Sequence, residues 1–359
     1  MELETIELKG TPAQMGGAFG EACREEIREL HERRLRSAVQ FAATWGDRSI
    51  SAAQVTAVAE SCLPFAEAYD PAGYEEFAAI AAGADMTPAD LFVMQGLTDM
   101  RDLLAFGEVD GGECTAAIIP RERAQGARLL MAQNWDLETY NMPFVRLVHR
   151  RPETGPATWS LTLTGCLSLI GVNSEGVAVG NTNLRTTDGR RGVHYLQVLH
   201  RALACTSFED ALEAIRSAPR LSGHYYYLGF RDGRATGVEC SGQRSVLHPA
   251  RERPLVHTNH ATAAAIRAVE APDPGDSSRA RLRRLESLVD RHTDPIGIQD
   301  LKVMLSDHEG GNNAICRHNA PPVGVSTNAC VVLSPETREI HACRGQPHVG
   351  RFLTRGLPY

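Results

Sequence analysis

Apolar residues recur at helical spacing in the first third of the chain, whereas the rest mostly shows the short apolar runs typical of strands. The helical pattern predicts segments at about 12–45, 51–68, 74–82 and 86–104. Thr11 followed by Pro12 is typical of a helix start. We therefore predict a mainly helical N-terminal segment, residues 1–113, followed by a second region, residues 114–359.

The second region is predicted to be rich in strands. Strands are expected at 115–119, 129–133, 144–150, 158–163, 169–172, 176–179, 225–230, 236–240, 254–256, 324–333 and 339–344. Helices are expected at about 193–204, 208–217, 279–292 and 297–306. Turn residues at 173–175 and 231–233 would join pairs of strands into hairpins. Helices mixed with many antiparallel strands predict an α+β fold in which helices cover stacked sheets.

Composition restricts the classes of function. The chain has 359 residues, of which 43% are hydrophobic and 23% are charged, so we expect a large core. Its 37 Lys and Arg residues against 44 Asp and Glu residues give a net charge of −7, which argues against a nucleic-acid partner. The short basic run Arg279, Arg281, Arg283 and Arg284 is interpreted as the solvated face of a helix. No apolar run is long enough to cross a membrane, so we expect no membrane partner.

The cysteine and histidine spacing predicts neither disulfides nor a metal site. Nine cysteines are widely spaced without a CxxC pair, and no secretory signal precedes them, so we expect reduced thiols in a cytoplasmic protein. His257 and His260 are close in sequence, but no further ligands lie at a spacing that zinc would need. We therefore predict no metal and no redox cofactor.

The junction between the two regions carries the first candidate for chemistry. In the sequence DGGECT, residues 110–115, a flexible glycine pair leads to Cys114 at the start of the first strand. Its thiol could attack the carbonyl of Glu113, and hydrolysis of the thioester would free Cys114 as a new N-terminus. The new α-amine, with a pKa of about 7.7–8.0, could then act as general base for the thiol of its own residue. On spacing alone, a structural buried cysteine is the simpler interpretation.

Three further segments carry polar groups that could serve the same site. The strand ending in QNWD, residues 133–136, offers Asp136 to an amine at Cys114, although a strand end with Trp135 in the core also explains it. In HTNH, residues 257–260, the side chain of Asn259 could donate to a developing oxyanion. Arg317 could either form a structural ion pair or bind a carboxylate.

In this order, these segments resemble the penicillin acyltransferase family, peptidase family C45, of self-processing N-terminal-nucleophile (Ntn) hydrolases. Other segments that match in register are Lys9–Pro12, Met15-Gly16, Phe19–Glu21, Gly171–Val179 and Gly237–Ser241. The resemblance implies an αββα sandwich. It also implies cleavage between Glu113 and Cys114 into chains 1–113 and 114–359 that stay together as one unit.

The resemblance also implies roles for individual residues. Cys114 would be the nucleophile, Asp136 the carboxylate near its amine, Asn259 the oxyanion donor and Arg317 a polar support of the site. The residues that would support substrate binding or processing are Thr115, Asn134, Ser241 and His257. The implied enzyme is a cysteine acyltransferase or amidohydrolase that acts on amide or acyl-thioester bonds of a small molecule through an acyl-enzyme. Acyl-CoA could be a co-substrate, and no other cofactor is implied.

Two alternatives stay open on the sequence. A Cys-His hydrolase would pair Cys114 with His257 or His260 and would be active in the uncleaved chain. A degenerate, non-catalytic binding protein on the same fold would stay uncleaved, and its function would not depend on Cys114.

Overall fold

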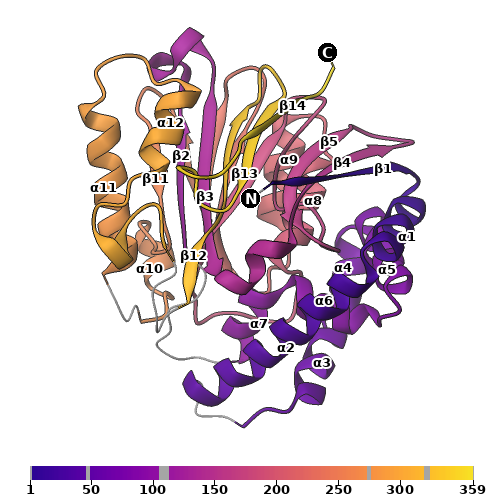
Figure 1. Ribbon diagram of the computed structural model, residues 1–359. Helices are drawn as coiled ribbons and strands as arrows, with labels where there is room; N and C mark the ends of the chain where they lie inside the picture. Colours follow the sequence, from indigo (N-terminus) through magenta and orange to yellow (C-terminus); the bar gives the residue numbers. More distant parts are fainter. Residues whose placement is uncertain (1, 46–48, 105–112, 273–275, 319–323, 359) are drawn as a thin grey trace.

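The computed structural model describes residues 2–45, 49–104, 113–272, 276–318 and 324–358, and its centre is a pair of stacked sheets (Figure 1). The larger sheet contains, in spatial order, β1 (Glu4–Gly10), β4 (Val145–Pro152), β5 (Thr158–Leu163), β6 (Ile170–Asn173), β7 (Ala178–Leu184), β8 (Gly223–Gly229), β9 (Ala235–Cys240) and β10 (Ser245–Ala250). The smaller sheet contains β11 (Leu255–His257), β2 (Glu113–Ile119), β3 (Leu130–Glu138), β12 (Val325–Ser334), β13 (Glu339–Arg344) and β14 (Leu353–Gly356).

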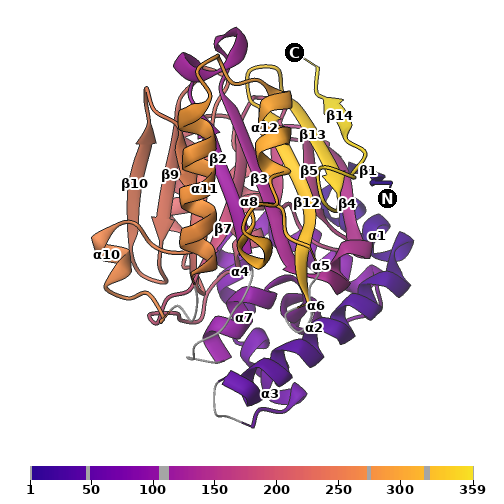
Figure 2. The same ribbon diagram turned by 60° about the vertical axis from the view of Figure 1, so that its left-hand side comes forward.

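Helices cover the outer face of each sheet. On the larger sheet these are α8 (Tyr195–Leu203) and α9 (Phe208–Ser217), and on the smaller sheet α11 (Ser277–Arg291) and α12 (Ile298–Leu305). Figure 2 shows α11 and α12 in front of β2, β3 and β12. The layers run helix, sheet, sheet, helix, so the predicted α+β class and αββα sandwich are confirmed.

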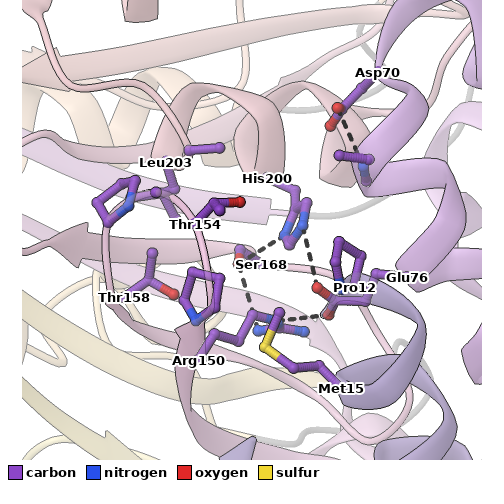
Figure 3. A pocket seen from close by; sticks show the side chains of 16 residues that line it. Pro12, Met15, Asp70, Glu76, Arg150, Thr154, Thr158, Ser168, His200 and Leu203 are labelled. Carbon is purple, nitrogen blue, oxygen red and sulfur yellow. Dashed lines mark hydrogen bonds and ion pairs between the residues drawn. The ribbon is translucent and has the colours of Figure 1, made fainter. Parts of the chain in front are cut away.

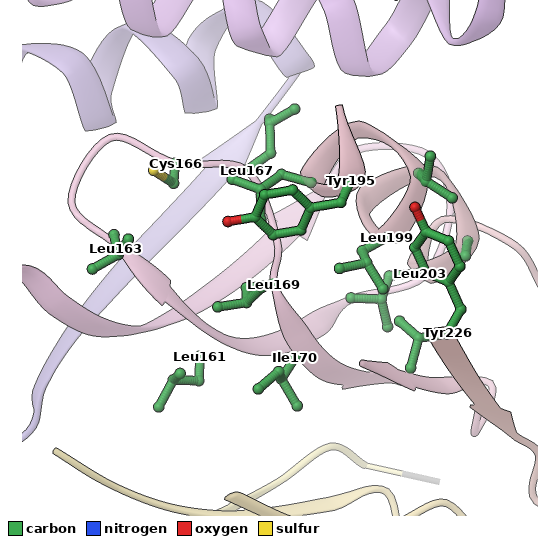
Figure 4. Packing of buried hydrophobic residues seen from close by; sticks show 14 of the residues in the cluster. Leu161, Leu163, Cys166, Leu167, Leu169, Ile170, Tyr195, Leu199, Leu203 and Tyr226 are labelled. Atoms are coloured by element: carbon green, nitrogen blue, oxygen red, sulfur yellow. The ribbon is translucent and has the colours of Figure 1, made fainter. Parts of the chain in front are cut away.

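Alternate side chains of β2 pack into two different layers of the hydrophobic core. In β2, Ala116 and Ile118 belong to the hydrophobic cluster between the sheets, while Ala117 and Ile119 belong to a second cluster beneath α11 and α12. Successive side chains of a strand point to opposite faces, so every position of a central strand is buried. On the far side, Leu199 of α8 lies over the larger sheet, as Figure 4 shows.

The N-terminal segment is a group of helices at one end of the sandwich (Figure 1). Its helices are α1 (Pro12–Ala22), α2 (Arg24–Trp45), α3 (Ala52–Glu60), α4 (Leu63–Tyr69), α5 (Pro71–Gly83), α6 (Pro88–Gln95) and α7 (Leu97–Leu104). The predicted start of the first helix is confirmed, with Thr11 as its N-cap and Pro12 as its first residue. The predicted continuous helix 12–45 is wrong, because it ends and restarts at Cys23, and helix 86–104 is likewise divided at Gly96.

A close approach of two helices explains the glycines in the first helix. A Cβ atom added at Gly16 would lie 2.2 Å from the carbonyl oxygen of Glu76, and one at Gly20 would lie 2.3 Å from that of Ile80. Both distances are far below van der Waals contact, so any side chain here would push α1 away from α5. The glycines of α1 therefore let α5, which carries Glu76, pack directly on α1.

The N-terminal segment also contributes a strand that was not predicted. β1 pairs in parallel with β4 along its whole length, from Glu4 opposite Arg146 to Gly10 opposite Pro152. It forms the edge of the larger sheet, so the segment 1–113 is mainly helical but not wholly so. Its charged residues alternate with apolar ones, as suits an edge strand with one face in solvent.

Several other elements differ from prediction. The strand expected at 176–179 extends to Leu184, and the one expected at 129–133 extends to Glu138. Strands β10 and β14 were not predicted. Short helical elements that were also missed are α10 (Ala264–Arg267) and the 3₁₀ turns Arg121–Arg123, Gln125–Ala127, Thr139–Phe144 and Gly311–Asn313.

Across the described residues, no single helix has both the length and the apolar character to cross a membrane. The bent pair α5 and α6 reaches that length and composition only when the two are taken together.

Candidate active site

Cys114 lies near the start of β2 and is 4% exposed. Its backbone is held on both sides. The N–H donates to Oδ1 of Asn259 over 2.7 Å, and the carbonyl oxygen accepts from the guanidinium of Arg281. The peptide bond at which cleavage was predicted is therefore next to an anchored residue.

Arg281 is the main site residue that the sequence missed. It is fully buried, and besides the carbonyl of Cys114 it donates to Oγ1 of Thr115 and Oδ1 of Asn259, each over 3.0 Å. The predicted solvated face is therefore wrong for Arg281. A signal was present, because residues 281, 285 and 289 recur at helical spacing on the buried stripe of α11.

Asn259 is held in place by contacts on its other side. Its Nδ2 donates to the carbonyl of Asn183 over 3.0 Å, and its backbone N–H donates to Oγ of Ser278 over 2.9 Å. The structure thus brings the predicted residues Cys114 and Asn259 together, with the oxygen of the amide facing the backbone nitrogen of Cys114. The role of Asn259 as an oxyanion donor stays a prediction.

A run of buried polar residues in β7 lies across from β2. Within this run, the carbonyl of Asn181 accepts from Nε2 of Gln133 over 2.7 Å, and the hydroxyl of Thr182 donates to the carbonyl of Thr258. Oε1 of Gln133 accepts from the hydroxyl of Tyr227 over 2.7 Å. The sequence analysis did not use the polar residues of β7, which interrupt an apolar strand. Contacts from this part of β7 connect the larger sheet to the residues around Cys114.

His257 is occupied by other partners. Its Nδ1 lies 2.8 Å from the carbonyl of Thr258, its Nε2 lies 3.3 Å from Oε1 of Glu239, and its ring stacks on Tyr225 with centroids 3.8 Å apart. Neither ring nitrogen of His257 is bonded to Cys114. A Cys114–His257 dyad, one form of the Cys-His alternative, is therefore not formed.

Glu239 organises the segment that carries Asn259. Burial alone would raise the pKa of this carboxyl, but hydrogen bonding and charge from His257, together with hydrogen bonds from Thr262 and the backbone of Ala263, lower it to about 2. The backbone N–H groups of Thr262 and Ala263 each donate to it over 2.9 Å. An ionised Glu239 thus fixes the turn after β11, a positioning role that the sequence did not reveal.

Asp136 and Arg317 both lie beside Thr327 of the smaller sheet. Asp136 is fully buried in β3, opposite Glu113 on one side and Thr327 on the other. The backbone N–H of Arg317 donates to Oγ1 of Thr327 over 2.9 Å, and its carbonyl accepts from the N–H of Thr327 over 3.1 Å. Asp136 therefore lies next to the start of β2, and Arg317 lies beside β12, on the other side of β3.

The surroundings of Cys114 favour the protonated form of its thiol. Burial, followed by the charge of Asp136, raises its pKa to about 12, although Arg281, Gln133 and a backbone hydrogen bond from Asp136 partly oppose the shift. A thiol in this state is a weak nucleophile at neutral pH, so reaction requires a base that removes its proton.

Comparison with known proteins decides the family. Residues 123–349, more than half of the chain, match the family described as acyl-coenzyme A:6-aminopenicillanic acid acyl-transferase. The chain belongs to this acyltransferase family. One relative, the acyl-coenzyme A:6-aminopenicillanic-acid-acyltransferase 40 kDa form of Emericella nidulans, is 26% identical over 291 residues, which cover 79% of this chain and 76% of the relative. The predicted family and the prediction that the chain is an enzyme are thereby confirmed.

Solved structures give a more distant likeness. Penicillin V acylase from Agrobacterium tumefaciens has a TM-score of 0.47 at 13% identity, covering 68% of this chain and 86% of that one. A mutant of conjugated bile acid hydrolase from Clostridium perfringens has a TM-score of 0.45 at 10% identity, covering 68% of this chain and 97% of that one.

Two other predicted residues of this chain bond to groups other than Cys114. Asn134 is fully buried, and its Nδ2 donates to the carbonyls of Leu305 and Ile315, so it ties β3 to α12 and the following loop. Ser241 donates to Oδ2 of Asp188 over 2.6 Å and accepts from the backbone of the turn that follows it. The predicted support roles of both residues stay predictions, as does that of Thr115.

A separate pocket of this chain contains a buried ion pair. Figure 3 shows Glu76 of α5 between Arg150 and His200 in a pocket of about 130 Å³. Nε of Arg150 lies 2.7 Å from Oε1 of Glu76, and Nε2 of His200 lies 3.6 Å from Oε2. The pair links the N-terminal segment to the larger sheet, and Cys114 does not line this pocket.

The glycine pair predicted to make the junction flexible, Gly111 and Gly112, lies outside the described residues, as does Asp110. The backbone of Glu113 is described as the first residue of β2.

Proposed function

We propose that this chain is a self-processing cysteine Ntn enzyme that cleaves itself before Cys114 and then transfers or hydrolyses acyl groups of a small molecule. The observation that carries the proposal is the anchoring of Cys114 on both sides, by Asn259 at its nitrogen and Arg281 at its carbonyl. Any buried backbone needs hydrogen-bond partners, but here two polar side chains that also bond to each other supply both of them at the predicted cleavage point. Membership of an acyltransferase family supports the same conclusion.

Self-cleavage would begin with the thiol of Cys114 and the carbonyl carbon of Glu113. The sulfur forms a bond to this carbon, the C–N bond breaks, and the thiol proton passes to the nitrogen that leaves as an amine. Water then hydrolyses the thioester, which gives a carboxylate at Glu113 and restores the thiol. Oδ1 of Asn259 already accepts from this nitrogen, so it is placed to hold the amine as it forms.

Several contacts would hold the two chains together after cleavage. β1 of the first chain pairs with β4 of the second through seven residues. The ion pair between Glu76 and Arg150 crosses the same boundary, and so does the 2.6 Å contact between Oδ1 of Asp99 and Nε2 of His224. Separation would also expose to water the apolar residues that the two segments bury against each other, so we expect the two chains to stay associated.

In the cleaved form, the α-amine of Cys114 would act as the base for its own thiol. Its ordinary pKa of about 7.7–8.0 suits proton transfer at neutral pH. Asp136 would orient the amine, and Arg317 would support Asp136 from the neighbouring backbone. In the intact chain Nδ2 of Asn259 donates to Asn183, so donation to an oxyanion requires that hydrogen bond to be exchanged when substrate binds.

The substrate is proposed to be a small-molecule amide or acyl thioester. The family and the Emericella nidulans relative are named for an acyl-coenzyme A donor and a 6-aminopenicillanic acid acceptor. The acyl group would move to the thiol of Cys114 with loss of the amine or coenzyme thiol. It would then pass to an amine, which makes the enzyme a transferase, or to water, which makes it a hydrolase.

The acyl-enzyme can be trapped directly. Purified protein is mixed with a series of acyl-CoA thioesters or N-acyl amides, quenched in acid and weighed by denaturing mass spectrometry. We expect the chain that begins at Cys114 to gain the mass of one acyl group, and Cys114→Ala to gain none. Cys205→Ser is the matched control, because Cys205 is a half-buried thiol whose pKa burial also raises, to about 11. Acylation that persists in Cys114→Ala would contradict the proposal.

A further inference from the structure

Three histidines and a cysteine meet beside the end of the smaller sheet. His308, Cys316 and His318 come from the loop after α12, and His348 comes from the turn after β13. Their ligand atoms all lie within 4.8 Å of one another, and Sγ of Cys316 lies 3.6 Å from Nδ1 of His348. The spacing along the chain is irregular, which is why the sequence predicted no metal site. The histidines of the HTNH segment take no part in this group.

The separations suit a tetrahedral metal site. Zn–N bonds of about 2.0–2.1 Å and Zn–S bonds of about 2.3 Å place neighbouring ligand atoms about 3.3–3.6 Å apart. The distance from Cys316 to His348 already has this value. The three imidazole rings have centroids 4.6, 5.0 and 5.3 Å apart, so small side-chain rotations would bring the remaining donors into range.

The backbone that carries these residues is held in place. The N–H of Cys316 donates to the carbonyl of Asp307 over 2.8 Å, and Nδ2 of Asn134 donates to the carbonyl of Ile315 over 3.0 Å. The turn that carries His348 closes through a 2.8 Å bond from the N–H of Gly350 to the carbonyl of Gln346. Both ligand-bearing segments are therefore fixed before any metal binds.

The nitrogen and sulfur atoms of these four residues are available to bind a metal ion. Cys316 is buried while the three histidines are exposed, so one side of the group is open to solution. Among the described residues, no carboxylate forms an ion pair with these three rings, and the nearby Asp307 is paired with Arg284 over 2.6 Å. Nitrogen and sulfur donors without carboxylates favour a borderline-soft ion such as Zn²⁺ over Ca²⁺ or Mg²⁺.

We propose that His308, Cys316, His318 and His348 bind one zinc ion. Four protein ligands complete a tetrahedral coordination shell, which is typical of a structural site and not of a catalytic one. The ion would fasten the loop after α12 to the turn after β13. Arg317 lies between two of the ligands and its backbone pairs with Thr327, opposite Asp136, so the clamp would fix this side of the Cys114 site.

Zinc content tests the proposal without any assay of activity. The full-length protein is treated with a chelator, dialysed, titrated with Zn²⁺ and analysed for bound metal, and Co²⁺ replaces Zn²⁺ to give an absorption spectrum. We expect one ion per chain and a Co²⁺ spectrum with tetrahedral geometry and a sulfur-to-metal charge-transfer band. The double variant His308→Ala/His348→Ala should bind at least about a hundredfold more weakly.

Matched variants keep the test decisive. His292→Ala removes a histidine outside the group, and Cys114→Ala removes the other candidate thiol, so both should still bind one ion. Cys316→Ser should lose the charge-transfer band while its circular dichroism matches that of the unaltered protein. A chain that binds no zinc, or a double variant that binds as tightly as the unaltered protein, would overturn the proposal.

Discussion

Cys114 and Cys316 are two buried thiols near one carboxylate, Asp136. Burial, followed by the charge of Asp136, raises the pKa of each thiol to about 12. Their other neighbours differ. Cys114 has its backbone anchored by an amide and a guanidinium at the start of a strand, whereas Cys316 lies among imidazoles in a loop.

Burial and a raised pKa are common to both thiols, so they do not separate the proposed nucleophile from the proposed metal ligand. The proposed reaction at Cys114 depends on groups that position the peptide bond between Glu113 and Cys114. The same groups would position the α-amine of Cys114 after cleavage. Chemistry at Cys316 depends on donor atoms that converge on one point in space. Each of the following predictions alters the surroundings of one residue or the pH, and states the expected result.

The largest effect is expected from Asn259→Ala, which removes the acceptor for the nitrogen of Cys114. Loss of one group that stabilises the transition state typically lowers kcat by about 10²–10³-fold. We expect a reduction of this size, measured as kcat on already cleaved protein, while zinc binding at Cys316 is unchanged. An unchanged kcat would show that Asn259 does not take part in catalysis.

A smaller effect is expected from Arg281→Lys, which keeps the charge but loses the forked contact to Cys114, Thr115 and Asn259. Hydrogen bonds to charged groups contribute about 1.5–3 kcal/mol, so self-cleavage should slow by about ten- to a hundredfold. The rate is followed by gel electrophoresis after refolding. Arg283→Lys, on the exposed face of the same helix, should cleave at the original rate. Equal rates in the two variants would contradict the anchoring role.

The pH dependence of cleavage is expected to report the raised pKa of Cys114. Because that pKa is about 12, the thiolate fraction rises about tenfold for each pH unit well below it. In the slow Arg281→Lys variant, the logarithm of the rate should therefore rise with a slope near one from pH 7 to 9. A plateau near the ordinary cysteine pKa of about 8.5 would contradict this environment.

The last prediction concerns the stability of the folded chain in acid, which limits the pH range over which the two thiols can be compared. Burial lowers the pKa of His194 to about 3, from an ordinary value near 6.5. The unfolded chain then binds a proton that the folded chain does not, so stability is complete above pH 6.5 and falls by up to about 1.4 kcal/mol per pH unit toward pH 3. Urea unfolding at several pH values measures the loss. His194→Phe should reduce this slope, and an unaltered slope would show that other groups dominate.

The sequence predicted the layers and most of the site, but only part of the network around it. Motifs in a fixed order led to Cys114 and Asn259, which lie in contact although far apart in the chain. Periodicity places Arg281 on the same stripe as Leu285 and Val289, but charged residues on helices usually face solvent, and this expectation led to the wrong prediction. The contact of Arg281 with Cys114 depends on how α11 packs on the sheet.

Two other features depend on tertiary structure in the same way. In β1, apolar and charged residues alternate only from Ile6 to Lys9, which is too short a pattern to predict the strand, and pairing with β4 defines its full length. The group around Cys316 brings together a loop that precedes β12 in the chain and a turn that follows β13. Local spacing carries no information about such convergence.

Intact mass under denaturing conditions tests the central claim most directly. The account predicts two masses for freshly purified protein, those of chains 1–113 and 114–359, and one full-length mass for Cys114→Ala. Native mass spectrometry should show the two chains still associated. A single full-length mass for the unaltered protein, unchanged after prolonged incubation, would contradict self-cleavage before Cys114.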